Sequence, residues 1–552
     1  MSAEKILSVR DLRVSYGGPD VVSGVDFDIG AGEFVALVGE SGSGKSTVTN
    51  AVTGLLPRQA KITGSIELDG HQLVGLHPRQ FTKLRGTSVG LVPQDPALSL
   101  NPVLTIGRQV GEVFRLHHRG LGRHEIRRRS IELLDQVGID RAAQRLRQYP
   151  HELSGGLKQR VLIAIAFGLD PRLLIADEPT SALDVTVQKQ VLAVFDRLTA
   201  EHNTSVLFVT HDLALATDHA TQVLVMRGGE LLEQGPVAQV VRAPEHRYTG
   251  VLLDAAAVHF RDSHTRARDT GTEVLVRATN LVKRFGVRGG GSTSVAAVDD
   301  VSFQIRRGTT FSLVGESGSG KSTTARLVLG LVEATSGTVE LDGVRQDQRN
   351  FRTRREYWRR IQYVYQNPQI ALDPRFTVER VIAEPLVEFG IGDRAERRAR
   401  VVELLEQVGL PVEFVRRRSR DLSGGQQQRV AIARALALGA EVIVLDEALS
   451  ALDVVTQAQI LALLQRLQRE LGVTYLFISH DLAVVRQISD DIGVLRRGKL
   501  VETGSVADIF DRPRHEYTQE LLASIPGRRY GPVLAARDRA LVTVGAETAV
   551  SA

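Results

Sequence analysis

A nine-residue string, GESGSGKST, occurs twice and constrains the fold of this chain more than any other feature. It spans Gly39–Thr47 and Gly315–Thr323, and its two lysines lie 276 residues apart in a chain of 552. Both copies match G-x-x-x-x-G-K-[ST], a pattern whose glycines let successive backbone N–H groups surround phosphate oxygens. Two matches in register are not accidental. The repeat therefore predicts two domains of one kind, each with a phosphate loop between a strand and a helix.

Further matched pairs define the extent of the repeat. Ser154 and Ser423, and likewise His211 and His480, are separated by the same 269 residues. The spacing is constant over the later part of each copy, so length changes lie earlier. We predict a first domain over 1–255, a linker over 256–272, a second domain over 273–526 and a mobile tail over 527–552.

Continuous apolar runs within each half end on an acid or a histidine. Examples are LLIAD at Leu173–Asp177 and VIVLD at Val442–Asp446. Strands that are apolar throughout are typical of parallel sheets covered on both faces. Between Gln94 and Ser154 the sequence becomes basic and helical in pattern. The prediction is an α/β fold in which each domain has a mainly parallel sheet and an inserted helical subdomain.

Composition excludes several classes of function. The chain has no cysteine, which excludes disulfides, thiolate zinc sites, cysteine-bound iron–sulfur clusters and cysteine nucleophiles. It has no apolar run of about 18 residues that could span a membrane, and its first residues lack the apolar core of a secretory signal. The net charge of +5 is a weak excess for this length. We expect a cytoplasmic protein that does not bind nucleic acid.

The motifs assign chemistry to matched residues in both halves. The loop lysines would reach the terminal phosphates of a nucleotide, and the serines after them would bind Mg²⁺. The acid at each strand end would bind the same ion, and the glutamate after it would act as general base. An ordinary acidic pair would not recur in register with both phosphate loops. These residues are Lys45, Ser46, Asp177 and Glu178, and Lys321, Ser322, Asp446 and Glu447.

Of all the motifs in this chain, the most diagnostic are the strings LSGGLKQR at Leu153–Arg160 and LSGGQQQR at Leu422–Arg429. A serine followed by two glycines at a helix start offers a hydroxyl, free backbone N–H groups and the positive helix end to an anion. A single such string is usually only a helix cap. Here each lies 23 residues before the strand-end acid of its half, which favours the anion site.

Together these motifs resemble those of the ATP-binding-cassette (ABC) ATPases, and the resemblance covers nearly all of both halves. It implies two tandem P-loop NTPase domains of ABC type, each with an antiparallel β part. It also implies a head-to-tail sandwich that holds ATP and Mg²⁺ between the phosphate loop of one cassette and the signature of the other. Asp184 and Asp453, in the two SALD strings, would cross the interface.

The resemblance also assigns the site residues. The catalytic residues would be Glu178, Glu447, His211 and His480. The metal site would use Ser46, Gln94, Asp177, Ser322, Gln366 and Asp446. Nucleotide contacts would come from Tyr16, Gly39, Ser41, Gly42, Ser43, Gly44, Lys45, Ser46, Thr47, Gln94, Ser154, Gly155 and Gly156, and from Phe285, Gly315, Ser317, Gly318, Ser319, Gly320, Lys321, Ser322, Thr323, Gln366, Ser423, Gly424, Gly425 and Gln426.

Both halves close with related strings, PEHRYTGVLL at Pro244–Leu253 and PRHEYTQELL at Pro513–Leu522. These resemble the D-type and F-type ATPase subunits of dipeptide, oligopeptide and nickel importers, fused in one chain. The resemblance implies a motor on the cytoplasmic face of a bacterial plasma membrane that drives two integral-membrane permeases. An extracytoplasmic substrate-binding protein would be an indirect partner. A surface turn with a packed proline and tyrosine is the plainer interpretation of each string.

Two other functions stay open: a soluble tandem ABC ATPase that acts on ribosomes or nucleic acid, and an exporter motor. Soluble relatives usually carry a long charged helical linker, whereas the linker here is short and polar. The segment Phe351–Gln366 mixes arginines with aromatic residues. It reads as a basic amphipathic helix that leads into a strand rather than as a nucleic-acid surface.

Departures from the ABC pattern cluster in one of the two expected composite sites. They are Leu157 in the first signature, Ala448 where the first half has Pro179, and Phe285 as the ring residue. Because proline favours extended backbone in the residue before it, Glu178 should be more constrained than Glu447. We therefore expect the site of Lys45, Glu178 and Ser423 to be the stronger in hydrolysis.

Overall fold

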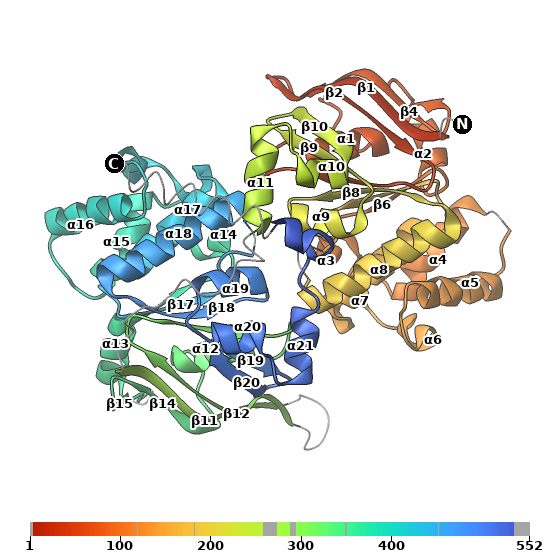
Figure 1. The fold of residues 1–552 in the computed structure, drawn as a ribbon. Helices are drawn as coiled ribbons and strands as arrows, with labels where there is room; N and C mark the ends of the chain where they lie inside the picture. Colours follow the sequence, from red (N-terminus) through yellow and green to blue (C-terminus); the bar gives the residue numbers. More distant parts are fainter. Residues whose placement is uncertain are drawn as a thin grey trace. The chain divides into compact units, whose positions relative to one another are not determined.

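The computed structural model describes residues 4–118, 120–180, 183–257, 273–286, 294–347, 350–450 and 452–534. The chain divides into two compact units, Met1–Phe260 with Pro526–Ala552, and Arg261–Ile525 (Figure 1). The predicted linker, 256–272, lies outside the described residues except for Ala256 and Ala257, which end helix α11. Each unit is described by itself.

The first unit contains a six-stranded sheet in the order β10-β9-β3-β8-β7-β6. Five of its strands are parallel and β10 is antiparallel at one edge. Every residue of β3 and β8 is buried, as apolar strands covered on both faces require. The strands are β3 (Phe34–Val38), β6 (Val89–Val92), β7 (Leu173–Asp177), β8 (Ser205–Thr210), β9 (Gln222–Arg227) and β10 (Glu230–Pro236).

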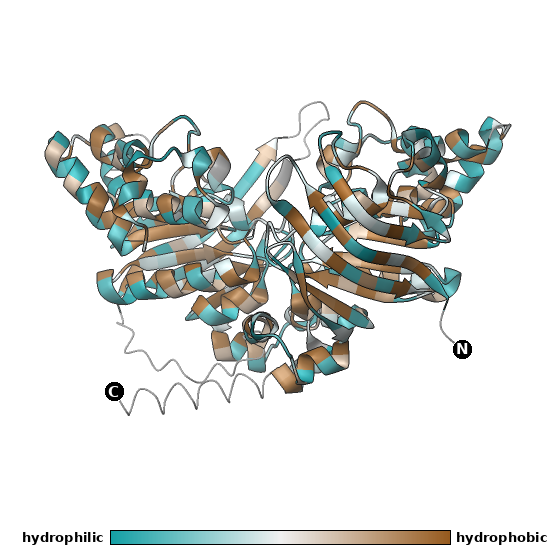
Figure 2. Ribbon diagram, turned by 90° about the horizontal axis from the view of Figure 1, so that it is seen from above, coloured by the Kyte–Doolittle hydropathy of each residue, from teal (hydrophilic) through white to brown (hydrophobic). Residues whose placement is uncertain are grey.

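A second, antiparallel sheet in the order β2-β1-β4-β5 packs over the first. Its strands β1, β2 and β4, together with those of the parallel sheet and helix α1, contribute to one apolar core. Figure 2 colours much of the strands as apolar, whereas the outer helices alternate between apolar and polar residues. The elements are β1 (Lys5–Ser15), β2 (Asp20–Gly30), β4 (Lys61–Leu68), β5 (His71–Gln72) and α1 (Lys45–Thr53).

The predicted helical subdomain lies between β6 and β7. It consists of α3 (Pro96–Ser99), α4 (Ile106–His117), α5 (Arg123–Gln136), α6 (Ala142–Arg145), a 3-10 turn (Pro150–Glu152) and α7 (Gly155–Phe167). The remaining helices of the unit are α2 (Pro78–Leu84), α8 (Val185–His202), α9 (Leu213–His219), α10 (Val237–Arg242) and α11 (Arg247–Ala257). The α/β class and the inserted subdomain are confirmed.

The second unit repeats this architecture. Its sheets have the orders β16-β17-β18-β13-β19-β20 and β12-β11-β14-β15. The strands are β11 (Val274–Gly286), β12 (Ser294–Arg306), β13 (Thr310–Val314), β14 (Ser336–Leu341), β15 (Val344–Arg345), β16 (Ile361–Val364), β17 (Val442–Asp446), β18 (Thr474–Ile478), β19 (Asp491–Arg496) and β20 (Lys499–Ser505).

The helices of the second unit follow the same order as those of the first. They are α12 (Lys321–Val328), α13 (Phe351–Arg360), α14 (Pro368–Ala371), α15 (Val378–Glu388), α16 (Arg394–Gln407), α17 (Gly424–Leu436), α18 (Val454–Leu471), α19 (Leu482–Ile488), α20 (Val506–Asp511) and α21 (Glu516–Leu522), with 3-10 turns at Val412–Arg416 and Ser419–Asp421. The arginine-rich segment forms α13 and leads directly into β16, so the prediction of a helix before a strand is confirmed.

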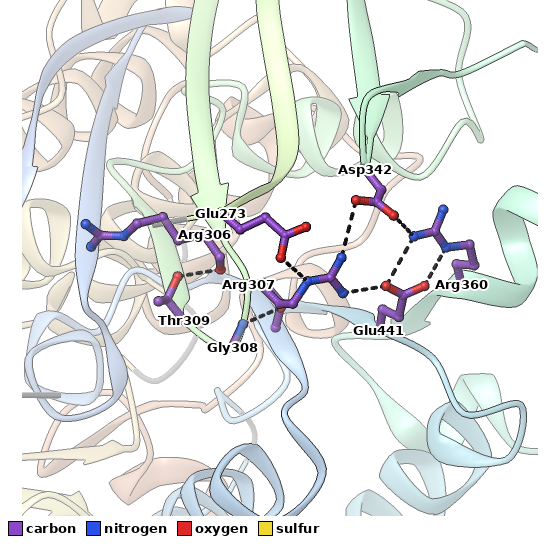
Figure 3. A network of polar contacts seen from close by, with 9 residues as sticks. Glu273, Arg306, Arg307, Gly308, Thr309, Asp342, Arg360 and Glu441 are labelled. Atoms are coloured by element: carbon purple, nitrogen blue, oxygen red, sulfur yellow. Dashed lines mark hydrogen bonds and ion pairs between the residues drawn. The ribbon is translucent and has the colours of Figure 1, made fainter. Parts of the chain in front are cut away.

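A network of charges joins the two sheets of the second unit (Figure 3). Arg307, in the turn after β12, donates hydrogen bonds to Glu273, Asp342 and Glu441. Arg360, at the end of α13, donates to Glu441 and Asp342. The network therefore links one end of the antiparallel sheet to the residue before β17.

The first residues after the second unit lie against the first unit. A 3-10 turn, Arg528–Tyr530, follows Gly527, and Asp218 in α9 accepts hydrogen bonds from the backbone N–H groups of Gly527 (2.6 Å) and Arg529 (3.0 Å). Leu534 is fully buried. Residues 527–534 of the expected mobile tail thus pack on the first unit, and 535–552 lie outside the described residues. None of the described helices is both long and apolar enough to cross a membrane.

Candidate active site

The phosphate loops connect β3 to α1 and β13 to α12, as the sequence predicts. Lys45 and Lys321 are buried first residues of these helices. The Lys45 ammonium donates to the carbonyls of Gly39 and Glu40, both at 2.8 Å. Lys321 donates in the same way to Gly315 (2.7 Å) and Glu316 (2.8 Å). The loop's own carbonyls therefore hold each ammonium in place.

The last glycine of each loop is required by its backbone. Gly44 and Gly320 have φ values of 99° and 108°, which L-residues rarely adopt. A Cβ on Gly44 would lie 2.9 Å from the carbonyl oxygen of Val21, and one on Gly320 would lie 2.4 Å from that of Ala297. Only glycine allows the turn into the helix at this point.

The loops carry buried polar atoms that a phosphate would satisfy. The hydroxyls of Ser43 and Ser319 are buried, and neither has a hydrogen-bond partner. A buried hydroxyl without a partner is unfavourable unless a ligand supplies one. Around them, Ser41, Gly42, Ser317 and Gly318 are exposed, and Thr47 and Thr323 are half-buried at the start of the helices. This arrangement suits an anion held by the loop.

The strand-end acids meet the loop serines in both units. Ser322 Oγ donates to Asp446 Oδ1 at 3.0 Å, and Ser46 hydrogen-bonds to Asp177. Burial raises the pKa of Asp177, although the hydrogen bond from Ser46 opposes the shift. Asp177 Oδ1 is buried without a partner. A hydroxyl oxygen beside a carboxylate with spare acceptor capacity is the donor set that Mg²⁺ takes, so these residues fit the ion.

A tyrosine that no sequence motif predicted distinguishes the second acid from the first. The hydroxyl of Tyr363, in β16, donates to Asp446 Oδ2 at 2.7 Å. Leu91 occupies the matching position of β6 in the first unit. Asp446 therefore has two side-chain donors, whereas Asp177 keeps one oxygen without a partner.

Glu178 is held at both carboxylate oxygens. Gln94 Nε2 donates to its Oε2 at 2.9 Å, and His211 Nδ1 lies 3.4 Å from its Oε1. Burial opposes ionisation of both side chains, but their contact outweighs burial, so the pKa of His211 is raised and that of Glu178 is lowered. The structure thus brings together three of the predicted site residues as a charged pair with an amide donor.

The second unit contains the same group of three side chains. Gln366 Nε2 donates to Glu447 Oε2 at 2.7 Å, and His480 Nδ1 lies 3.5 Å from Glu447 Oε1. Burial lowers the pKa of His480, but the hydrogen bond and charge of Glu447 raise it by more. The two glutamates therefore have the same partners at nearly the same distances.

The expected effect of Pro179 on the glutamate backbone is wrong. Glu178 and Glu447 have φ values of 44° and 47°, so both are left-handed and neither is extended. The reason is tertiary. Each glutamate N–H donates to the neighbouring strand, Glu178 to Val209 O and Glu447 to Ile478 O, both at 2.9 Å. These hydrogen bonds fix the turn whether proline or alanine follows.

The signature serines cap the helices α7 and α17. Ser154 Oγ accepts from Leu157 N and Ser423 Oγ from Gln426 N, both at 3.4 Å. Gln426 Oε1 also accepts from Ser423 N at 3.0 Å, a second bond that Leu157 cannot make. Within the described residues, neither serine hydrogen-bonds to the phosphate loop of its own unit.

The other signature residues shape the helix start. A Cβ on Gly156 or Gly425 would lie 2.2 or 2.5 Å from a methyl group of Val187 or Thr456, so helix α8 or α18 packs closely there. Gly155 and Gly424 begin the two helices. Asp184 and Asp453 cap α8 and α18 by accepting from Val187 N and Thr456 N.

The two expected adenine-stacking rings lie at the surface. Tyr16 follows β1 and Phe285 is the penultimate residue of β11, with exposed fractions of 38% and 48%. The ammonium of Lys283 lies 5.3 Å from the centre of the Phe285 ring. Exposed rings beside a phosphate-loop domain are available for stacking.

Comparison with known proteins agrees with this geometry. The family model described as "ABC transporter" matches residues 22–181 and 298–450. The model described as "Oligopeptide/dipeptide transporter, C-terminal region" matches residues 501–533. The two ABC matches cover the phosphate loop, the signature and the strand-end acids of each unit.

Three proteins illustrate the overall similarity. The glutathione import ATP-binding protein GsiA of Pectobacterium atrosepticum is 42% identical over 95% of this chain and 90% of its own length. The peptidoglycan transport ATP-binding protein YejF of Agrobacterium fabrum is 43% identical over 95% and 97%. The oligopeptide transport ATP-binding protein OppD of Mycobacterium tuberculosis is 40% identical over 94% and 98%.

Proposed function

Because this chain belongs to the ATP-hydrolysing subunits of the ABC transporter family, we propose that it is the motor of an importer for oligopeptides or dipeptides. The match to the oligopeptide/dipeptide transporter region at residues 501–533 carries this proposal. It is supported by relatives named for import or transport of glutathione, peptidoglycan and oligopeptides, each aligned over at least 94% of this chain.

Each cassette has the side chains needed to bind and hydrolyse ATP. In the first, Lys45 and the loop N–H groups would bind the terminal phosphates, and Ser46, Asp177 and Gln94 would hold Mg²⁺. Bound there, the ion would neutralise phosphate charge and favour attack by water. Because the pKa of Glu178 is lowered, its carboxylate is ionised at neutral pH and can accept a proton from that water. In the second cassette, the matching roles would be taken by Ser322, Asp446, Gln366 and Glu447.

His211 and His480 keep these glutamates oriented. Each holds one oxygen of the general base, and a glutamine holds the other. A base fixed at both oxygens loses little freedom when it receives a proton, which favours reaction in a defined geometry. The raised pKa values of the histidines favour their cationic forms, which can also face phosphate charge.

Import would follow from ATP-driven association of the two cassettes, with the signature of each completing the site of the other. Their association would move two integral-membrane permeases on the cytoplasmic face of a bacterial membrane, through the region of Gln94 and Gln366. Joining both cassettes in one chain raises their effective concentration to about the millimolar range. An extracytoplasmic binding protein would deliver the peptide.

The proposed function predicts that this chain forms a stable complex with two permeases. The chain should co-purify with two multi-span permease proteins of its own organism, and they should stimulate its ATPase activity. The Glu178→Gln, Glu447→Gln double variant should still co-purify but lose ATPase activity by about 10²- to 10⁴-fold, the usual contribution of a general base. Co-sedimentation with ribosomes, and no binding to permeases, would favour the soluble alternative instead.

A further inference from the structure

A buried tyrosine touches the phosphate loop in both units. The hydroxyl of Tyr248, in the first turn of α11, accepts a hydrogen bond from Glu40 N at 3.1 Å. The hydroxyl of Tyr517, in α21, accepts from Glu316 N at 3.0 Å. Both tyrosines are buried, with exposed fractions of 5% and 1%. The plainer interpretation of the closing strings, a surface turn, does not account for this contact.

The residue whose N–H group the tyrosine accepts also holds the loop lysine. Glu40 donates its N–H to Tyr248 and accepts the Lys45 ammonium at its carbonyl. Glu316 does the same between Tyr517 and Lys321. One residue thus separates the tyrosine hydroxyl from the group that would bind phosphate, in both cassettes.

A glutamate and a histidine position each tyrosine. Glu233, at the edge strand β10, accepts the N–H groups of Glu245 (2.9 Å) and His246 (3.0 Å), and His246 Nδ1 accepts Tyr248 N at 3.0 Å. The closing string therefore forms a fixed turn that starts α11. In the second unit, Glu502, His515 and Tyr517 repeat these contacts within 0.2 Å.

An arginine covers the outer face of each ring. The guanidinium of Arg227 lies 4.7 Å from the centre of the Tyr248 ring, and that of Arg496 lies 4.6 Å from the centre of the Tyr517 ring. Arg227 Nε also lies 3.3 Å from Glu40 Oε1. The ring is therefore held on one side by a cation, which favours a single orientation of its hydroxyl.

We propose that Tyr248 and Tyr517 are positioning residues for ATP binding: through Glu40 and Glu316 they hold the phosphate loops in the form that presents Lys45 and Lys321. The closing strings would then act on the nucleotide site of their own cassette. This inference rests on the proposed function only in that the loops bind ATP; it needs neither peptide nor permease.

The test replaces each tyrosine by phenylalanine in the full chain. Phenylalanine keeps the ring and its arginine contact, but it leaves a loop N–H without its partner. The loss of such a hydrogen bond should raise the Kd for a ribose-labelled fluorescent ATP analogue about five- to tenfold. Tyr248→Phe is measured with the second loop disabled by Lys321→Ala, and Tyr517→Phe with Lys45→Ala.

Tyr475→Phe is the matched control. Tyr475 is fully buried in β18, and its hydroxyl donates to Leu464 O at 3.0 Å, a contact that involves no part of a phosphate loop. It should lower the melting temperature without changing the Kd. In the Tyr248→Phe, Tyr517→Phe chain, the KM for ATP should rise while kcat stays within about twofold, since the lysine binds phosphate in both ground and transition states.

A second pair of variants tests the inference if the Tyr→Phe variants fold poorly. Glu233→Gln and Glu502→Gln keep the hydroxyls but weaken the turn that carries them, so the Kd should rise by less, about two- to threefold. Unchanged Kd values in folded Tyr→Phe variants, with a loss of melting temperature equal to that of Tyr475→Phe, would overturn the inference alone. A wild-type chain that binds no ATP would instead contradict the proposed function.

Discussion

Burial and ion pairing have opposite effects on the pKa values of Glu178 and His211. Burial favours the neutral forms of Glu178 and His211, yet their contact favours the charged form of each. Gln94 satisfies the remaining carboxylate oxygen. An ionised base is therefore ready before ATP arrives, and the charge on the base determines the charge on the histidine.

Replacing Glu178 by Gln should lower the pKa of His211, because burial then opposes the charged form and only the weaker effect of the Asp212 charge still favours it. The charged pair stabilises the fold fully below the ordinary pKa of histidine, and this stabilisation is lost as pH rises through the raised pKa of His211. A titration of isotope-labelled histidine by NMR measures the shift. Glu447→Gln is the control and should move only His480; a His211 titration unaffected by Glu178→Gln would contradict this account.

Asp177 lacks the second side-chain donor that Asp446 has, and this difference should affect how Mg²⁺ binding depends on pH. The raised pKa of Asp177 lets protons compete with Mg²⁺, so Mg²⁺-dependent nucleotide binding should fail as pH falls through it. Leu91→Tyr would supply the donor that Tyr363 gives Asp446, lower the pKa of Asp177 and move this loss to lower pH.

The measurement is Mg²⁺-dependent binding of labelled ATP against pH, with the second loop disabled by Lys321→Ala. Leu91→Phe is the matched control, since it adds the ring without the hydroxyl and should leave the pH dependence as in the parent chain. Identical profiles for Leu91→Tyr and Leu91→Phe would show that the hydroxyl has no such effect.

At the scale of elements, the apolar runs of the sequence were sufficient to predict the parallel strands, because strands buried on both faces leave a continuous apolar signal. The phosphate loops and signature helices were predicted from spacing. The contacts of Tyr248 and Tyr363 could not be predicted from the sequence. Their partners are a backbone amide and a carboxylate that only the tertiary fold brings near. The prediction from Pro179 was wrong for the same reason. The backbone conformation of Glu178 is fixed by a hydrogen bond to the neighbouring strand and not by the residue that follows.

The charge network of Figure 3 should stabilise the second unit but not the first. Arg307→Ala removes three ion pairs and should cost about 1–2 kcal/mol of unfolding free energy, less at 1 M salt. Arg360 and Arg307 lower the pKa of Glu441. The contribution of Glu441 to the free energy of unfolding is therefore present above the ordinary pKa of a glutamate. It is lost as pH falls through the lowered pKa of Glu441.

Urea unfolding at low and high salt measures this effect. Arg345→Ala is the control, because Arg345 is exposed in the same unit and the described residues show no ion pair for it. Equal losses for the two variants, or an Arg307→Ala effect that does not change with salt, would show that the network contributes little.

For the whole molecule, the repeat predicted two cassettes, and each described unit has a complete set of loop, acid, glutamate, glutamine, histidine and signature. Neither unit is a degenerate copy, since the two glutamates share the same partners and backbone conformation. We therefore expect both cassettes to hydrolyse ATP during transport.

Uptake of labelled peptide into proteoliposomes tests this account most directly. The vesicles contain the two permeases that co-purify with this chain, with the chain and ATP on the side that corresponds to the cytoplasm and the binding protein on the other. We predict ATP-dependent uptake with the wild-type chain and none with the Glu178→Gln, Glu447→Gln variant. Uptake that persists in the double variant, or a wild-type chain that hydrolyses ATP at one rate with and without permeases and transports no peptide, would contradict the account.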